Sequence, residues 1–177
     1  MENFEPKLNS YLVGHDEALN MFLTAYKSNN MHNSWLISGI EGIGKATFAY
    51  KIARFLLSPK TENVTSLNIS DNSLTFRQVA SNSHPDLKVI EREYSDSSKT
   101  KLKTEISVEQ IRELKEFFSK TSSEGGYKIA IIDSVDDMNQ NSSNALLKIL
   151  EEAPNKSLLI LICNNYDEAV AGVKAIM

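Results

Sequence analysis

The most constraining feature of the sequence is a glycine-rich stretch, GIEGIGK at residues 39–45, between a short apolar run and an amphipathic segment. Glycines there let backbone N–H groups converge on an anion at a helix N-terminus, where the helix dipole favours negative charge. Between a strand and a helix this pattern predicts a phosphate loop, and the alternative is a tight turn with a surface lysine. The candidate phosphate-binding residues are Gly39, Gly42, Gly44 and Lys45.

Helical and strand patterns alternate along the rest of the chain. Apolar residues at helical spacing predict helices over 17–27, 45–57, 74–79 and 144–152. A capping box formed by Ser107 and Gln110 predicts the start of another helix. Short apolar runs predict strands over 35–38, 87–91, 128–133 and 158–163. The last two runs are almost continuously apolar, which is typical of strands covered by helices on both faces of a parallel sheet.

This alternation predicts the α/β class, as a three-layer sandwich around a mostly parallel sheet, of the type found in phosphate-loop nucleotide-binding proteins. No internal repeat or shift in composition marks a second domain, so we expect residues 1–177 to form a single domain. Residues 58–85 are rich in Ser and Asn, and we expect an exposed loop insertion there that holds only the short helix at 74–79.

Composition excludes several classes of protein. With 177 residues, 41% hydrophobic and 24% charged, the chain is neither disordered nor fibrous. Its longest apolar run, 158–163, is far shorter than the ~20 residues of a membrane-spanning helix. Residues 1–12 lack the apolar stretch of a signal peptide, so we expect a cytoplasmic protein without membrane contact. The net charge of −4 gives no overall attraction to nucleic acid.

Residues suited to metal, redox or nucleophilic chemistry are few. Cys163 is the only cysteine, which excludes an intrachain disulfide and a multi-cysteine zinc site. Inside an apolar strand its thiol should be buried, with a raised pKa. His15, His32 and His84 lack metal-ligand spacing, so we expect packing or backbone contacts for them and no metal site.

The basic side chains show no pattern that indicates a binding site. Lys99, Lys101 and Lys103 fall in a polar stretch and are expected at a solvated loop tip. The arginines are expected as surface residues of helices or strands; they are Arg54, Arg77, Arg92 and Arg112. Trp35 begins a strand and is expected in the core.

One residue needed for metal chemistry is missing from the glycine loop. A working phosphate loop carries Ser or Thr directly after the lysine, because that hydroxyl ligates the Mg²⁺ that bridges the phosphates. Here that position is Ala46. Thr47 is the nearest hydroxyl, but it lies about 100° further around the helix. We keep Thr47 as a candidate site residue and expect no bound metal.

The strand at 128–133 ends in Asp133, the usual position of a carboxylate that holds the metal in such proteins. In members that hydrolyse nucleotide, a glutamate normally follows and orients the attacking water, whereas this chain has Ser134. Asp136 and Asp137 lie beyond the strand end, and we expect them to be capping or solvated residues.

Several blocks of sequence resemble one family, the delta-prime subunits of the bacterial DNA polymerase III clamp loader, which belong to the AAA+ superfamily. The blocks are VGH at 13–15, the stretch at 32–53, SHPDL at 83–87 and above all residues 106–164. Within the last block, the combination of IDSVDDMN and NALLKILEEAP is specific to clamp-loader subunits. The resemblance covers most of the chain.

The resemblance implies a non-hydrolysing structural subunit of a pentameric loader that opens the sliding clamp and places it on primed DNA. Its implied partners are the motor ATPase and delta subunits, with clamp and DNA engaged indirectly. The substitutions at Ala46 and Ser134 agree with that role, because hydrolysis would belong to the motor subunits. The resemblance also places Val13-Gly14-His15 beside an adenine pocket if nucleotide binds.

The sequence departs from the family pattern in three places. Many clamp-loader subunits carry a four-cysteine zinc module in the region of 58–84, where this chain has no cysteine, so no zinc is expected. The family's Ser-Arg-Cys arginine-finger motif falls on 175–177, where Ile176 replaces the arginine. The chain also stops at Met177, before the expected lid and collar domains, and a truncated, a shortened and a divergent chain all remain open.

Two other functions compete with a structural subunit. One is a competent AAA+ ATPase in which Thr47 and Asp137 compensate for the missing residues, with Lys45 and Asp133 as its best support. The other is a small phosphoryl-transferring enzyme, which the absence of a basic cluster for an acceptor phosphate disfavours. If the chain is a structural subunit, it stays open whether its loop is empty or binds ATP with Mg²⁺ without hydrolysis.

Overall fold

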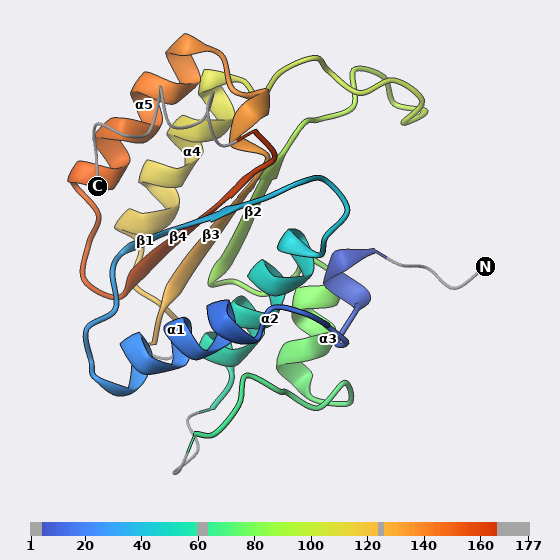
Figure 1. Ribbon diagram of the computed structural model, residues 1–177. Helices are drawn as coiled ribbons and strands as arrows, with labels where there is room; N and C mark the ends of the chain where they lie inside the picture. Colours follow the sequence, from blue (N-terminus) through green and yellow to red (C-terminus); the bar gives the residue numbers. More distant parts are fainter. Residues whose placement is uncertain (1–4, 60–63, 124–125, 166–177) are drawn as a thin grey trace.

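Four parallel strands form the centre of the molecule in the computed structural model, which describes residues 5–59, 64–123 and 126–165 (Figure 1). In space their order is β1-β4-β3-β2. Their bounds are β1 (Ser34–Ser38), β2 (Leu87–Glu91), β3 (Lys128–Asp133) and β4 (Ser157–Cys163). All three pairings are parallel, so the carboxyl ends of the four strands share one edge of the sheet. The predicted strands are confirmed to within one residue.

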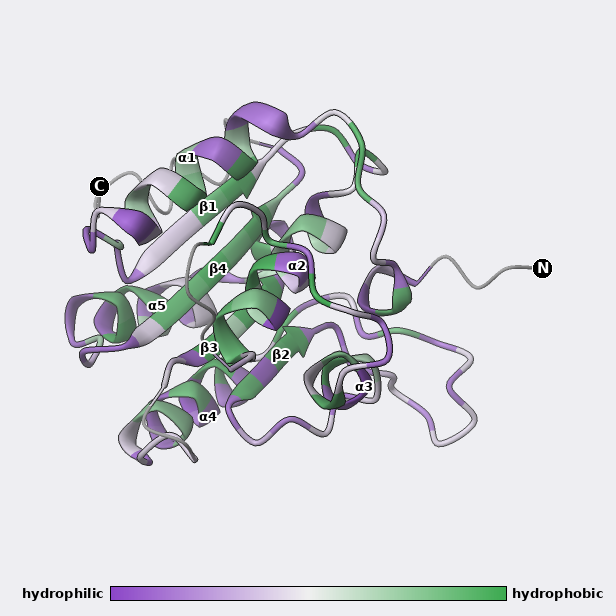
Figure 2. Ribbon diagram, turned by 90° about the horizontal axis from the view of Figure 1, so that it is seen from below, coloured by the Kyte–Doolittle hydropathy of each residue, from purple (hydrophilic) through white to green (hydrophobic). Residues whose placement is uncertain are grey.

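Helices cover both faces of this sheet (Figures 1 and 2). One face carries α1 (Asp16–Lys27), α2 (Lys45–Leu57) and α3 (Leu74–Ala80). The other carries α4 (Val108–Ser119) and α5 (Gln140–Glu151). Two short 3₁₀ helices, η1 (Pro6–Leu8) and η2 (Val135–Asp137), complete the described elements. The predicted α/β class and three-layer arrangement are confirmed.

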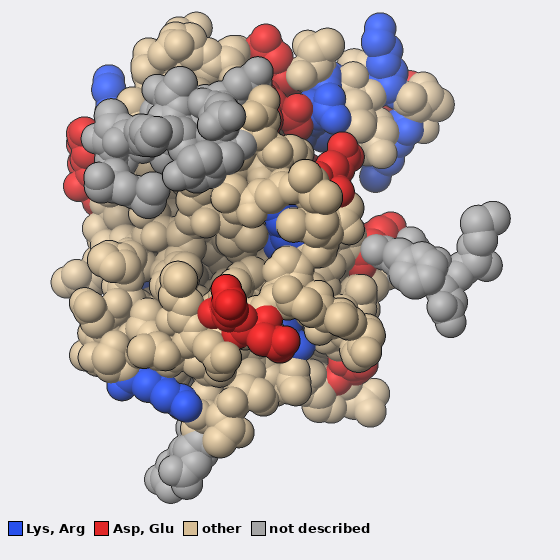
Figure 3. Space-filling model, viewed as in Figure 1, with Lys and Arg blue, Asp and Glu red and all other residues tan. Residues whose placement is uncertain are grey.

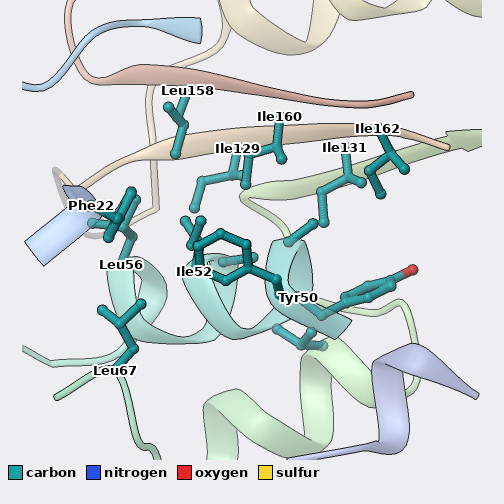
Figure 4. Packing of buried hydrophobic residues seen from close by; sticks show 14 of the residues in the cluster. Phe22, Tyr50, Ile52, Leu56, Leu67, Ile129, Ile131, Leu158, Ile160 and Ile162 are labelled. Atoms are coloured by element: carbon teal, nitrogen blue, oxygen red, sulfur yellow. The ribbon is translucent and has the colours of Figure 1, made fainter. Parts of the chain in front are cut away.

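Alternating side chains of β3 and β4 build two hydrophobic clusters, one on each face, because successive residues of a strand point to opposite sides. Toward α2 point Ile129, Ile131, Leu158, Ile160 and Ile162, which pack with helix residues such as Phe22, Ile52 and Leu56 (Figure 4). Toward α4 and α5 point Ala130, Ile132, Leu159, Leu161 and Cys163. Both strands are therefore buried on two sides, as their composition indicates. In the same core, Trp35 packs edge-on against Phe22, with ring centroids 5.2 Å apart.

The predicted start of α5 at residue 144 is wrong, because the helix begins at Gln140. Asn139 caps it by accepting hydrogen bonds from the backbone N–H groups of Asn141 and Ser142. The Ser142 hydroxyl is buried and donates to the Ile106 carbonyl at 2.8 Å. The polar run before residue 144 is thus the first turn of a capped helix. The capping box of Ser107 and Gln110 at the start of α4 is confirmed.

Residues 58–85, expected as an exposed insertion, are described at 58–59 and 64–85; most of these residues are exposed, but a few side chains are anchored in the core. Leu67 and Val79 are buried in the cluster around α2, and Phe76 is only 9% exposed. Three apolar side chains among polar neighbours are enough to fix the segment against the domain. The short helix predicted at 74–79 is confirmed as α3.

A buried ion pair lies at the edge of the sheet where β3 begins. Lys128 Nζ lies 3.1 Å from Asp86 Oδ1, and both side chains are at most 10% exposed. The Ser123 backbone N–H and hydroxyl also donate to Asp86, and the Lys128 ammonium lies 4.3 Å above the Phe117 ring centroid. The pair ties the turn before β2 to the start of β3, and no local pattern in the sequence indicates it.

Among the described residues, none of the helices is long and apolar enough to cross a membrane.

The loop after β2 projects from the domain and carries the group of Lys side chains at the upper right of Figure 3. Lys99, Lys101 and Lys103 are all exposed there, which confirms the predicted solvated tip.

Candidate phosphate-binding site

The glycine loop runs from the carboxyl end of β1 into α2, as its sequence context predicts. Its first residue extends the sheet, because the Gly39 N–H donates to the Cys163 carbonyl of β4 at 3.2 Å. Its last glycine, Gly44, is the N-cap of α2 and has a φ of +94°. A Cβ at Gly44 would lie 3.0 Å from Leu12 Cδ1. The left-handed backbone therefore favours glycine at this position, and the close approach of Leu12 adds to that preference.

Lys45 stands in the first turn of α2 and is 4% exposed. Its ammonium donates 2.7 Å hydrogen bonds to the Gly39 and Ile40 carbonyls. The lysine thus bridges the start of the loop and the first turn of the helix that follows. An incoming phosphate would compete with these two carbonyls for the ammonium.

His15 supports the loop from the side of α1. Its Nε2 lies 2.7 Å from the Ile43 carbonyl, and its ring stacks on Phe48 at a centroid distance of 5.9 Å. Because a carbonyl only accepts, Nε2 carries the proton in this arrangement. The predicted backbone contact of a histidine is therefore confirmed here. His84 has the same kind of role, since its Nδ1 accepts from the Asp86 backbone N–H at 3.1 Å.

Asp133 ends β3 at the edge of the sheet where the glycine loop lies. Burial raises the pKa of its carboxyl, and the negative charge of Glu91 adds to that effect. The positive charge of Lys45 acts in the opposite direction, which places the two groups in one electrostatic environment. The structure thus brings Asp133 to the site with Lys45, although the lysine's hydrogen bonds go to the loop carbonyls.

Ser134, in the position where a hydrolysing protein has its glutamate, is 4% exposed and has a structural role. Its hydroxyl hydrogen-bonds to the Asp136 carboxylate and lies 3.2 Å from the Ile162 carbonyl. Asp136 in turn accepts the backbone N–H groups of Asn164 and Asn165 just after β4. This network joins the ends of β3 and β4, which agrees with a capping role for Asp136.

Asp137, the other carboxylate beyond β3, pairs with Arg92, with 3.1 Å between Oδ2 and Nε. The same residue raises the pKa of Asp133 through its negative charge. An ion-paired carboxylate is poorly suited to orient an attacking water. Asp136 and Asp137 are therefore both engaged in structural contacts, Asp136 with the backbone after β4 and Asp137 with Arg92.

The donor set at this site fits a phosphate better than a metal ion. The start of α2 and Lys45 supply N–H donors and a positive charge, which suit an anion. For Mg²⁺, Asp133 is available, but Ala46 has no hydroxyl and Thr47, one residue on, is 7% exposed. In the part of the chain that the structure describes, no three His, Cys, Asp or Glu side chains are grouped to hold a metal. Ile176, at the position expected for the arginine finger, lies outside the described residues.

Asn164 lies at the same edge and was not among the site residues predicted from the sequence. It follows β4 directly, and its side-chain Nδ2 lies 3.5 Å from the Ser134 hydroxyl. A polar residue immediately after a fully apolar strand was the signal available in the sequence. Cys163, just before it, is fully buried, and burial together with Asp136 raises the pKa of its thiol to about 11, as predicted.

The fold and the site together define a class of protein. A parallel sheet covered on both faces, with a glycine loop between β1 and α2 and an aspartate at the end of β3, is the phosphate-loop α/β architecture of the AAA+ type. Residues 14–174 match the family model described as "DNA polymerase III, delta subunit". The chain therefore belongs to the delta-prime-like family of DNA polymerase III subunits.

Relatives of known name agree with this family. The chain is 30% identical over 141 residues to DNA polymerase III subunit delta' of Buchnera aphidicola subsp. Schizaphis graminum, covering 80% of this chain and 40% of that protein. It is 29% identical over 143 residues to the delta' subunit of Pseudomonas aeruginosa, covering 81% and 40%. The chain thus spans about 40% of the length of these two relatives.

Subunits with other names share the same region. The chain is 28% identical over 158 residues to DNA polymerase III subunit tau of Escherichia coli, covering 89% of this chain and 23% of that protein. A crystal structure of a DNA polymerase III gamma subunit-related protein from Thermotoga maritima superimposes with a TM-score of 0.55 at 18% identity, covering 88% of this chain and 43% of the other. At that identity the superposition supports the fold alone.

Proposed function

We propose that this protein is a structural subunit of the bacterial replicative clamp loader, and that its own phosphate loop does not hydrolyse ATP. The observation that carries the second part is Ser134. A general base or water-orienting carboxylate is needed after Asp133, and the residue found there is a buried hydroxyl engaged with Asp136 and β4. Ala46 supports the same conclusion from the metal side, because it removes a ligand of the phosphate-bridging Mg²⁺.

In this proposal the partners are the motor ATPase subunits and the delta subunit of the loader. The sliding clamp and primed DNA are engaged through that assembly. Support comes from the family match over residues 14–174 and from the named delta', gamma and tau relatives. The acidic balance of the chain, with a net charge of −4, also favours work through protein contacts over direct attraction to DNA.

Binding of ATP without hydrolysis is compatible with this role. Lys45 and the first turn of α2 could hold phosphate oxygens, while Asp133 alone would offer a carboxylate to a metal. A competent ATPase would need Thr47 and Asp137 to act instead. Against that alternative stand the burial of Thr47 and the ion pair of Asp137 with Arg92.

The test is reconstitution with the motor and delta subunits of the same organism, followed by clamp loading on primed DNA. We expect the chain to co-purify with these subunits and to stimulate loading. Lys45→Ala should load as well as the wild-type chain, because hydrolysis takes place elsewhere. Failure to co-assemble would contradict the subunit role. A loss of loading and ATPase activity with Lys45→Ala would instead favour the competent ATPase.

A further inference from the structure

A second basic site lies on α2, beyond the phosphate loop. A cavity of about 380 Å³ opens between the N-terminal segment, α2 and the residues that precede α3. Its lining includes Ser10, Tyr11, Lys51, Arg54, Asn68 and Asp71. Lys51 follows Lys45 by six residues, which is about 9 Å along a helix, so this cavity is distinct from the glycine loop.

Arg54 is the unexpected member of this site, because the prediction that it is a surface residue is wrong. The side chain is only 2% exposed and lies 4.6 Å above the Phe76 ring centroid. Its guanidinium donates to the Lys7 carbonyl at 3.2 Å and to the Asn9 carbonyl at 2.8 Å. These acceptors are neutral, so they hold the group in place without neutralising its charge.

Lys51 lies one turn before Arg54 on the same face of α2. Its ammonium donates to the Ser10 carbonyl at 3.1 Å, which is again a neutral acceptor. No ion pair joins either cation to a carboxylate within residues 5–59, 64–123 and 126–165. An ammonium has three N–H groups and a guanidinium five, so both retain donors for a further acceptor.

The local charge balance is positive. Asp71 is the nearby carboxylate; it accepts the Ser10 hydroxyl at 3.0 Å. Burial and the charge of Arg54 lower the pKa of Lys51, while Asp71 opposes that shift. Burial likewise lowers the pKa of Arg54, again against the influence of Asp71. Two partly desolvated cations therefore face one carboxylate, and an added anion would relieve their repulsion.

We propose that this cavity binds an oxyanion of the phosphate type, held by Lys51 and Arg54. The two basic side chains would supply charge-assisted hydrogen bonds, and Ser10 and Asn68 line the same cavity. The ligand is either free phosphate or the phosphate group of a small monoester whose body occupies the rest of the space. This site is independent of the proposed loader function and of any nucleotide at Lys45.

The test measures phosphate-dependent stabilisation in a Lys45→Ala background, which removes the positive charge of the glycine loop as a competing phosphate ligand. The unfolding midpoint is followed against inorganic phosphate, and separately against phosphoserine, at constant ionic strength. We expect both to raise the midpoint. Tighter binding of phosphoserine would identify a monoester, and equal binding would identify phosphate itself. Adding Lys51→Met should weaken the apparent affinity at least tenfold, whereas Lys101→Met, at the exposed loop tip, should leave it unchanged.

A second variant keeps the test independent of any damage to the fold. Asp71→Asn removes the competing negative charge while keeping an oxygen that can accept from Ser10. We expect it to strengthen phosphate binding several-fold, an outcome that misfolding cannot produce. Equal phosphate stabilisation of the Lys51→Met and Lys101→Met proteins, with no gain in Asp71→Asn, would mean an adventitious ion only and would overturn the proposal.

Discussion

The Ser134 hydroxyl hydrogen-bonds to the Asp136 carboxylate, which also accepts the backbone N–H of Asn164 directly after β4. The position that would carry a water-orienting glutamate in a hydrolysing relative is thus part of the link between two central strands. A glutamate there would place a second carboxylate against Asp136 in a site that is 4% exposed at Ser134. Ser134, which stands in place of the catalytic glutamate, therefore also helps to join the ends of β3 and β4.

We predict that Ser134→Glu destabilises the protein and does not create ATPase activity. The substitution removes the hydrogen bond from the Ser134 hydroxyl to the Ile162 carbonyl, and Asp136 repels the new carboxylate. Together these effects should lower the free energy of unfolding by about 2–4 kcal/mol. Urea denaturation measures this change. Ser134→Ala is the matched control and should cost about 1–2 kcal/mol. A Ser134→Glu protein that is as stable as wild type and turns over ATP would refute the structural role given to Ser134.

Ala46→Thr should restore a Mg²⁺ ligand to the glycine loop. We expect the affinity for ATP in the presence of Mg²⁺ to rise about tenfold, with no change when Mg²⁺ is chelated, because the hydroxyl acts only through the metal. Calorimetric titration gives both values. Ala46→Val is nearly isosteric with the threonine variant and lacks the hydroxyl, so it should bind like wild type. An equal gain in the valine variant would mean that packing, not metal ligation, limits affinity.

The buried pair of Asp86 and Lys128 should make stability depend on acid. Burial alone would raise the pKa of Asp86, but hydrogen bonds from Ser123 and Lys128 outweigh it and lower that pKa below its usual value. The unfolded chain therefore binds the proton more readily than the folded one. The stabilisation is complete above the ordinary aspartate pKa of about 3.9 and is lost as the pH falls below it.

Asp86→Asn tests this dependence. At pH 7 it should lower the free energy of unfolding by about 3–5 kcal/mol, because Lys128 is left buried without its counter-ion. At pH 3 the difference from wild type should be smaller. Glu113→Gln, which breaks the exposed pair with Lys88, is the control and should cost at most about 1 kcal/mol at either pH. An Asp86→Asn cost that stays constant across this range would contradict the assignment.

Gly44→Ala should destabilise the start of α2. Its φ of +94° is unfavourable for a residue with a Cβ, and that Cβ would meet Leu12 Cδ1 at 3.0 Å. A loss of about 1–2 kcal/mol is expected in chemical denaturation. Gly126→Ala offers a comparison, because a Cβ there meets no atom within 4 Å. Equal stability of the two alanine variants would show that the loop adopts a different backbone.

The strands and most helices could be predicted because their signals are local. The apolar runs of β3 and β4 and the helical spacing of apolar residues in α2 indicate buried segments, and the glycine pattern indicates the loop between β1 and α2. The start of α5 was missed because Asn139 caps a run of polar residues whose anchor is the distant Ile106 carbonyl. Arg54 was misplaced for the same reason, since its acceptors lie 45 and 47 residues away in the sequence.

The site shows the same division between local and long-range signals. Lys45, Asp133 and the missing ligand at Ala46 follow from motif positions, and the structure brings the first two to one edge of the sheet. The network through Ser134, Asp136 and Asn164 depends on contacts between the ends of β3 and β4. Such contacts arise only after the sheet has formed, so spacing along the chain could not reveal them.

An equilibrium titration of the chain with ATP, with and without Mg²⁺, tests whether the phosphate loop can use Mg²⁺ despite Ala46. Lys45→Ala is the control. We predict either no binding at millimolar ATP or binding that Mg²⁺ does not strengthen. Micromolar binding that is lost when Mg²⁺ is removed, and also lost in Lys45→Ala, would contradict this prediction and would show that another ligand replaces the absent hydroxyl at Ala46.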